Sequence, residues 1–280
     1  MGSTSRSALR TKSAASTKTL SRSLGRRVLY AKGKDTTSIS PQRSCLVLAP
    51  HPDDETLGCG VTIMRKRDAG TPVKLVVFTD GSASSRSAVL SSDQLAAIRK
   101  SEALSACTML GLGEDDVVFL GYRDGHLEDF EDEVCVRLAA IINEFQPDEL
   151  LLPSITDWHG DHIALARALR RLNKWPSGRV LQYSVYFWKI WPWVLRSRPR
   201  SDLSAAWHLV WQSLRASIVL RPELVSTEGY LARKRGAVAA YRSQLQNLTG
   251  EREWWTMDDA WLADFFHPFE MFVPLPDRAY

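Results

Sequence analysis

The chain has 280 residues, of which 44% are hydrophobic and 24% are charged, a balance typical of a globular protein and sufficient for one large domain. No run of about 18 uncharged apolar residues occurs, so the sequence predicts no membrane-spanning helix. Four widely separated cysteines without a CxxC pair argue against a disulfide framework and against a cysteine zinc site, and they favour a reducing, cytoplasmic setting.

The net charge of +4 is distributed unevenly. Residues 1–44 contain ten Lys or Arg and one acid, whereas residues 45–280 contain 26 basic and 31 acidic residues. The first residues are rich in Ser, Thr and Arg and lack a secretory apolar core, so we expect disorder there. This composition suits an organelle transit peptide or a plain basic tail. We therefore divide the chain into a basic, partly disordered arm (1–44) and a single domain (45–280), and we expect no nucleic-acid partner.

A short amphipathic helix is predicted within the arm, because Leu20, Leu24 and Val28 recur every four residues among basic ones. One interpretation is that its apolar side packs on the domain. The other is that it contacts anionic lipid or an acidic partner, which would hold a cytoplasmic protein peripherally at a membrane.

Short apolar runs alternate with helical patterns through much of the domain. The apolar runs predict strands at 45–49, 73–78, 117–120, 149–152 and 180–186. The helical patterns cover 93–110, 131–145 and 163–172. This alternation indicates an α/β fold with a Rossmann-like, mostly parallel sheet and helices on both faces.

The pattern changes in the last third of the chain. Residues 188–208 contain four Trp and a basic Arg-Ser-Arg-Pro-Arg stretch, and we interpret them as an insertion in the domain. Trp188, Trp191 and Trp193 offer ring faces for sugar stacking or for lipid, or they belong to the core. A further helix is predicted at 228–246.

Two histidine–acid clusters follow predicted strands. Residues 50–55, Pro-His-Pro-Asp-Asp-Glu, come after the strand at 45–49, and residues 157–162, Asp-Trp-His-Gly-Asp-His, come after the strand at 149–152. Ligands of open parallel sheets bind beyond the carboxyl ends of the strands. Because strand ends about a hundred residues apart can be neighbours in such a sheet, the two clusters are predicted to face one pocket.

Three of these residues form a candidate zinc site. Hydrolytic zinc takes three nitrogen or oxygen ligands and leaves one position for water, and His51, Asp54 and His162 supply that set. The alternative is that each part has a separate structural role, because lone histidines are common in cores and Asp pairs often cap helices.

Three neighbouring residues carry groups that an amide hydrolase needs. Asp53 lies next to a ligand and is a candidate to accept the proton of the attacking water. His159 is a candidate to stabilise the developing oxyanion and to help protonate the leaving amine. Asp161 is predicted to hold a histidine in one tautomer.

Two strings resemble the signature of the PIG-L/LmbE-like deacetylases: Leu-Ala-Pro-His-Pro-Asp-Asp-Glu-Thr-Leu-Gly-Cys-Gly at 48–60, and His-Gly-Asp-His at 159–162. The similarity covers roughly residues 45–250. That family comprises zinc enzymes of Rossmann-like fold that deacetylate N-acetylglucosaminyl substrates, including glycolipid precursors, thiol-sugar conjugates and antibiotic intermediates.

The resemblance also implies individual roles. His51, Asp54 and His162 match the family's zinc ligands. Asp53 matches the general base, and His159 matches the second catalytic histidine.

Weaker matches lie elsewhere in the chain. Arg99 resembles the arginine of an Arg-x-x-Glu helix, and Asp124 resembles the aspartate of an Asp-Gly turn; in the family both contact sugar hydroxyls. Without the resemblance they are half of a surface pair with Glu102 and an ordinary turn residue. Lys234 and the segment 241–244 also resemble a family segment, from which we expect structural support.

The leading hypothesis is zinc-dependent hydrolysis of the N-acetyl group of an N-acetylglucosamine-type sugar, carried on a glycolipid, glycan precursor or glycoconjugate, giving acetate and a free amine. An alternative from another class is a catalytically silent sugar- or lipid-binding module, although binding alone does not need Asp53. A nucleotide-binding Rossmann enzyme is a third, but the loop after the first strand lacks GxGxxG.

Overall fold

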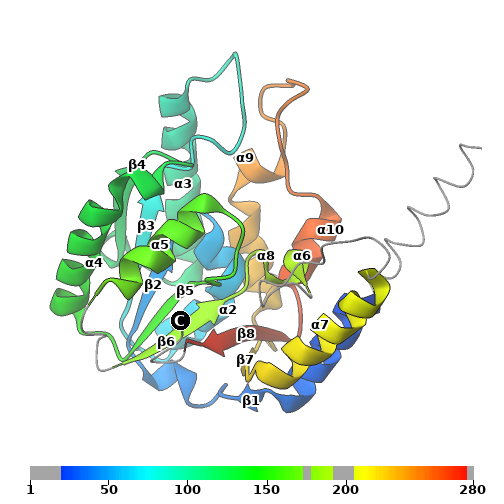
Figure 1. Cartoon of the computed structure of the whole chain (residues 1–280). Coiled ribbons are helices and arrows are strands. Elements are labelled where there is room, and N and C mark those ends of the chain that lie inside the picture. The colour runs from blue at the N-terminus through cyan, green and yellow to red at the C-terminus, as the bar shows by residue number, and fades with distance from the viewer. Residues whose placement is uncertain (1–19, 173–177, 192–204, 276–280) are drawn as a thin grey trace, which may run out of the picture.

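The structure, a computed structural model, describes residues 20–172, 178–191 and 205–275, and these residues form one mixed eight-stranded sheet flanked by helices (Figure 1). The strand order is β1-β7-β8-β6-β5-β2-β3-β4. The strands are β1 (Lys34–Asp35), β2 (Cys45–Ala49), β3 (Val73–Thr79), β4 (Val117–Tyr122), β5 (Glu149–Pro153), β6 (Arg179–Tyr183), β7 (Glu223–Ser226) and β8 (Phe269–Pro274).

The five strands from β6 to β4 in this order run parallel, whereas β8 is antiparallel to both β6 and β7. The α-helices are residues 20–32, α2 (Asp54–Asp68), α3 (Ser92–Leu110), α4 (Glu131–Phe145), α5 (Gly160–Arg170), α6 (Phe187–Ile190), α7 (Ala205–Val219), α8 (Leu231–Ala239), α9 (Arg242–Leu245) and α10 (Asp259–Leu262). Short 3-10 turns are η1 (Ser40–Gln42), η2 (Glu114–Asp116), η3 (Leu127–Phe130) and η6 (Ala263–Phe265).

Alternation along the central strand β2 supplies both layers of the core. Cys45, Val47 and Ala49 pack with buried residues of α2, α3 and α8 on one face of the sheet. Leu46 and Leu48 pack with buried residues of α4 and α5 on the other face. Successive side chains of a strand point to opposite faces, so an all-apolar strand requires cover on both sides. The predicted Rossmann-like α/β fold is confirmed.

The chain reverses its direction of travel across the sheet at β2. It continues from β2 to β3 and β4 on one side and then returns to β5 and β6 on the other. As a result β2 and β5 are hydrogen-bonded parallel neighbours, with Cys45 opposite Glu149. The expectation that these two strand ends meet is therefore confirmed, and the point between them is where open parallel sheets bind ligands.

Helix α2 is broken near its start. Cys59 has non-helical dihedrals, φ −143° and ψ 21°, which leaves backbone groups around it without intrahelical partners. The buried carboxylate of Glu270 accepts the N–H groups of Val61 and Thr62, each at 2.8 Å. The Nζ of Lys234 donates to the carbonyl of Leu57 and to Glu270, both at 2.8 Å. This Lys–Glu clamp, Lys234 with Glu270, fixes the first turns of α2.

The predicted amphipathic helix of the arm is present at residues 20–32, but it packs differently from the first interpretation. Leu29 is fully buried among Phe187, Trp188 and Trp191, while Leu20, Leu24 and Val28 are exposed. The core alternative is therefore correct for Trp188 and Trp191. The disorder predicted for the start of the arm falls on residues 1–19, and Trp193 and the Arg-Ser-Arg-Pro-Arg stretch fall on residues 192–204; both segments lie outside the described residues.

Two other expectations need correction. The helix predicted at 228–246 is two helices, α8 and α9, separated by Tyr241, which is buried and donates to Glu55. The strand predicted at 180–186 is shorter in the structure: β6 is Arg179–Tyr183, and the residues that follow it lead into α6. In both places a buried tyrosine that contacts the α2 region interrupts the predicted element. Tyr241 donates to Glu55, and the ring of Tyr183 packs so closely on Gly58 that no Cβ would fit there.

Candidate functional site

The two histidine–acid clusters meet at the carboxyl ends of β2 and β5. His51 and Asp53 lie in the loop after β2, and Asp54 is the first residue of α2. His159 is the N-cap of α5, where its side chain accepts the N–H of Asp161. The clusters thus sit at the amino ends of two helices, where the helix dipole favours carboxylates.

The three predicted ligand atoms form a nearly equilateral triangle. Asp54 Oδ2 lies 3.2 Å from His51 Nδ1 and 3.3 Å from His162 Nε2, and the two nitrogens are 3.3 Å apart. Bonds of about 2.0–2.1 Å to zinc at tetrahedral angles place ligand atoms about 3.3–3.4 Å apart. All three side chains are buried. The donor set and its spacing therefore fit a small tetrahedral cation.

Each histidine has its other ring nitrogen held by carboxylates. His51 Nε2 lies 3.0 Å from Asp161 Oδ2 and 3.1 Å from Asp124 Oδ1. His162 Nδ1 lies 2.9 Å from Asp157 Oδ2. Ligating histidines almost always donate their second N–H to such a partner, which fixes the tautomer that leaves the facing nitrogen free to bind metal.

Other combinations of these side chains also bring donors together. Ligand atoms of His51, His159 and His162, and of His51, Asp124, His159 and Asp161, lie within 4.8 Å of one another. We favour the triangle with Asp54 because its edges match a tetrahedral cation, and because Asp161 and Asp124 already contact the far nitrogen of His51. Every one of these groupings consists of His, or of His and Asp, side chains, so the cluster can hold a metal.

The electrostatics of the cluster favour a positive charge. Burial alone would lower the pKa of His162, but Asp54 and Asp157 raise it to about 9. For His51 the same burial effect is overcome by Asp124, Asp161 and Asp54, so its pKa is also raised. Burial would raise the pKa of Asp54, but His162 and His51 hold it well below the usual range. The buried acids thus stabilise a cation at this point.

Asp53 has an unusual backbone and an unusual partner. Its φ of 134° lies in the region that favours glycine, a strain of about 1–3 kcal/mol that ordinarily persists only where surroundings enforce it. Its N–H donates to Glu55, and its Oδ2 accepts from Arg99 Nη2 at 2.8 Å. Burial raises the pKa of Asp53 to about 7, Arg99 opposes that rise, and Asp54 adds to it.

His159 lies beside the triangle and is only partly buried. Its ring centroid is 4.4 Å from that of His51 and 5.3 Å from that of His162, and it stacks on Tyr186 at 6.3 Å. Burial, then the neighbouring histidines, lower the pKa of His159 to about 4. Because Nδ1 accepts from the Asp161 N–H, the proton of the neutral ring is on Nε2.

The two weaker sequence matches lie inside this site. Arg99 and Asp124 are both buried, Arg99 against Asp53 and Asp124 against His51. Their predicted contacts with sugar hydroxyls stay predictions. Glu102, a residue of α3, accepts hydrogen bonds from the N–H and the Oγ of Ser243, which ties the segment 241–244 to α3.

Sequence reasoning missed two features of the site. Asp157 opens the second cluster but received no role, although its position five residues before His162 was visible in the string. An aromatic rim was missed altogether: Trp158, Tyr186, Trp261 and Trp255 follow one another with ring centroids 5.5, 6.2 and 6.2 Å apart. Trp158 and Trp255 are exposed, so the rim offers free ring faces beside His159.

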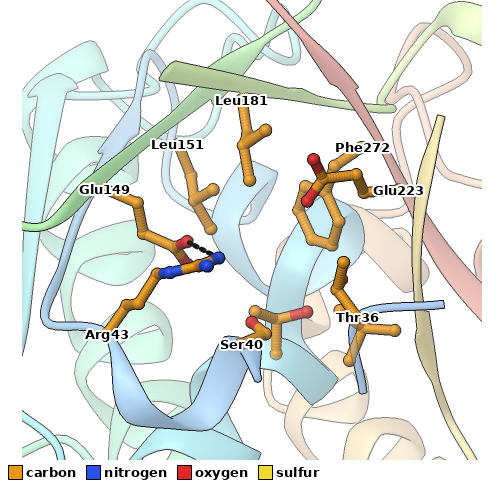
Figure 2. A pocket seen from close by; sticks show the side chains of 10 residues that line it. Thr36, Ser40, Arg43, Glu149, Leu151, Leu181, Glu223 and Phe272 are labelled. Atoms are coloured by element: carbon orange, nitrogen blue, oxygen red, sulfur yellow. Dashed lines mark ion pairs between the residues drawn. The ribbon is translucent and has the colours of Figure 1, made fainter. Parts of the chain in front are cut away.

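A separate hollow at the amino ends of the strands does not belong to this site. Figure 2 shows Glu149 and Glu223 among its lining residues, with Arg43 directed at Glu149. Glu149 also pairs with the buried Lys66 at 2.6 Å, and Glu223 pairs with Arg179. Because its acids are paired with cations of the chain, we interpret this region as structural.

Comparison with known proteins relates the same residues to one family. Residues 46–173 match the family model described as PIG-L, GlcNAc-PI de-N-acetylase. A probable N-acetyl-alpha-D-glucosaminyl L-malate deacetylase 2 of Bacillus cereus is 35% identical over 145 residues, which are 49% of this chain and 64% of that protein. A diacetylchitobiose deacetylase of Thermococcus kodakarensis is 30% identical over 43% of this chain and 45% of its own length. The match spans less than two thirds of either relative.

Solved structures extend the similarity of fold beyond the matched segment. A deacetylase from the biosynthesis pathway of teicoplanin superposes with a TM-score of 0.59 at 16% identity, over 82% of this chain and 97% of that one. At this identity the likeness concerns the fold alone. It covers far more of the chain than the family match does, so the α/β architecture is shared well past residue 173.

Proposed function

We propose that this chain, whose residues 46–173 match the PIG-L family model, hydrolyses the N-acetyl group of an N-acetylglucosamine-type sugar with zinc, giving acetate and a free amine. The observation that carries the proposal is the triangle of His51, Asp54 and His162, with both histidines oriented from behind by carboxylates. Neither a dinucleotide-binding loop nor a structural role for isolated histidines accounts for that arrangement.

In this proposal His51, Asp54 and His162 hold the metal, and one side of the triangle is left for water and substrate. Zinc supplies Lewis acidity: when bound it lowers the pKa of a coordinated water toward about 7 and polarises the acetyl carbonyl. Asp161, Asp124 and Asp157 keep the two imidazoles in the binding tautomer throughout the reaction.

Asp53 is proposed to move the proton. Its carboxylate accepts the proton of the attacking water and then returns it to the departing nitrogen, which requires a pKa near the working pH. The raised pKa of about 7 suits both directions of transfer. Arg99 holds the carboxylate through Nη2 and so keeps the second oxygen, Oδ1, free for this exchange.

His159 is proposed to stabilise the oxyanion. A neutral imidazole with its proton on Nε2 can donate a hydrogen bond to the negative oxygen that develops on the acetyl carbon. Because its pKa is lowered to about 4, His159 is neutral near pH 7 in the free site and carries no second proton to give to the amine. We therefore assign the amine's proton chiefly to Asp53, with His159 as the fixed donor.

The aromatic rim supports a sugar as substrate. Carbohydrate rings present apolar faces that stack on exposed indoles. Trp158 and Trp255 are exposed indoles at the two ends of the aromatic rim, which contacts His159 through Tyr186. The two curated relatives are named for N-acetylglucosaminyl malate and diacetylchitobiose. We propose a conjugate of N-acetylglucosamine for this chain as well.

One experiment tests the assignment: metal content and acetate release are measured together for three variants. His162→Ala should lose most of the roughly one zinc per chain and with it the activity. Asp53→Asn should keep its zinc while turnover falls about 10²–10⁴-fold, the range for losing a general base. His126→Ala, an exposed histidine outside the cluster, should retain both.

The outcomes separate the alternatives. Full zinc occupancy in His162→Ala would refute the ligand assignment, and near-normal turnover of zinc-loaded Asp53→Asn would exclude Asp53 as the base. Zinc binding without acetate release from any N-acetylated sugar, conjugate or glycolipid would favour the silent binding module instead.

A further inference from the structure

A strip of apolar side chains is exposed on two helices that lie far from the histidines in sequence. On helix 20–32, Leu20, Leu24 and Val28 are 71%, 61% and 38% exposed. On α7, the exposed apolar residues within 211–219, where the side chains are described, are Trp211, Leu214, Ile218 and Val219, at 50–60%. The spacings of three, four and seven residues put each set on one side of its helix. These residues are named the apolar strip below.

The two helices lie side by side at the periphery of the molecule (Figure 1). Ser21 Oγ lies 2.9 Å from Ser213 Oγ, and Lys32 Nζ donates to the carbonyls of Ser217 and Ile218. The inner sides of both helices are buried on the domain, through Leu29, Ala216 and neighbouring residues. The two halves of the apolar strip therefore flank one line of helix–helix contact and form one outer surface.

The charged residues of the two helices themselves have one sign. Residues 20–34 and 205–221 contain no Asp or Glu. Arg27 and Arg215 lie on the exposed sides of the two helices. Lys34 and Arg221 are exposed near the ends of the same helices. The 19 residues that precede Leu20 add four Lys or Arg and no acid. The two helices thus combine apolar side chains with positive charge only.

We propose that this surface docks the protein on an anionic lipid bilayer, with the apolar strip entering the headgroup region and the arginines contacting lipid phosphates. A paired amphipathic surface with a basic margin is what interfacial membrane helices present. None of the described helices is long and apolar enough to cross a membrane, so the contact would be peripheral.

A second copy of the chain fits this surface less well. A two-fold dimer brings the same patch against itself, so Arg27 and Arg215 would face like charges with no acid in either helix to compensate them. An anionic bilayer offers both an apolar layer and negative charge. Charge complementarity therefore favours lipid, and this inference is independent of the deacetylase proposal.

The test is sedimentation of the full chain with vesicles of phosphatidylcholine alone and of phosphatidylcholine with phosphatidylglycerol. Binding is expected only to the anionic vesicles, and it should weaken as salt rises from about 0.1 M to about 1 M, where the Debye length falls from about 10 Å to about 3 Å. Leu24→Ser/Ile218→Ser and Arg27→Glu/Arg215→Glu should each lower the partition coefficient at least about tenfold.

Matched controls come from the other side of the domain. Val136→Ser removes an equally exposed apolar residue from α4, and Arg170→Glu reverses an exposed arginine on α5. Both should bind like the parent protein, because exposed substitutions of this kind leave the folded structure intact. No binding to anionic vesicles, or equal loss in strip and control variants, would overturn the proposal. So would a lipid-free dimer that the Leu24→Ser/Ile218→Ser variant converts to a monomer.

Discussion

The two edges of the central sheet both bury acids, but they neutralise them in different ways. At the amino edge Glu149 pairs with Lys66, and Glu223 pairs with Arg179. At the carboxyl edge, in the described part of the chain, histidines are the only ion-pair partners of four buried aspartates, Asp54, Asp124, Asp157 and Asp161. Among the residues that the structure describes, Arg99 is the one arginine paired there, and it pairs with Asp53.

The difference teaches what each edge needs. Burying a carboxylate is costly unless a cation compensates it. The amino edge carries its cations in the chain, so its electrostatics are complete once the protein folds. At the carboxyl edge the negative charge is compensated by protonated histidines or by a metal. When zinc binds, it would replace the protons on the histidines. The contribution of the amino edge to the free energy of unfolding should therefore not depend on zinc.

The largest expected effect is on the amino edge. Lys66→Met removes the cation from the buried Glu149 and should lower the free energy of unfolding by about 3–5 kcal/mol, as breaking a buried pair does. Urea denaturation measures this, and the loss should be equal with and without zinc. Lys66→Met/Glu149→Leu should recover part of it, though not all, because Lys66 also donates to the carbonyls of Ser40 and Arg43. If the loss of unfolding free energy depended on zinc, the proposed difference between the two edges would be wrong.

Removing the metal tests the carboxyl edge directly. Zinc present at about 100 times its dissociation constant stabilises the folded state by about 2.7 kcal/mol, so a chelator should lower Tm by about 5–10 °C. Calorimetry or thermal fluorescence measures the shift. The same chelator should leave Tm of His162→Ala almost unchanged, since that variant has little zinc to lose. An equal shift in both proteins would mean that the zinc binds elsewhere.

The smallest effect sharpens the comparison at single carboxylates. Asp157→Asn keeps the shape of the partner of His162 but removes its charge, and zinc affinity should fall about 10–100-fold. Competition with a chromophoric chelator measures the affinity. The matched change at the amino edge, Glu223→Gln, should not alter it. If Asp157→Asn binds zinc as the parent does, Asp157 does not orient His162 as a ligand.

Much of the fold was predictable from the sequence because it is encoded locally. The strands β2, β3 and β5 are short, mostly apolar runs, and α3 begins at a Ser91 capping box and ends at Gly111, so each element carries its own signal. Helix α2 was not predicted over its length, because two glycines and the break at Cys59 disturb its pattern. Its helical state depends instead on the distant residues Lys234 and Glu270.

The candidate site divides in the same way. His51, Asp53 and Asp54 were found because they occupy one short loop, and His159, Asp161 and His162 because they occupy another; their roles stay proposals. The meeting of the two loops followed from parallel-sheet topology. The pairing of Arg99 with Asp53, of Asp124 with His51, and the aromatic rim could not be predicted, because each joins segments whose spacing in the chain carries no periodic signal.

The Lys–Glu clamp under α2 has a consequence for the making of the protein. Glu270 is 209 residues beyond Val61, whose N–H it accepts. A ribosome adding about 5–20 residues per second reaches it about 10–40 seconds after the histidine loop has emerged. Until then the first turns of α2 lack the partner that fixes them, so Asp54 has no settled position opposite His51. The newborn chain therefore displays its metal-binding motif before β8 is available to complete the pocket.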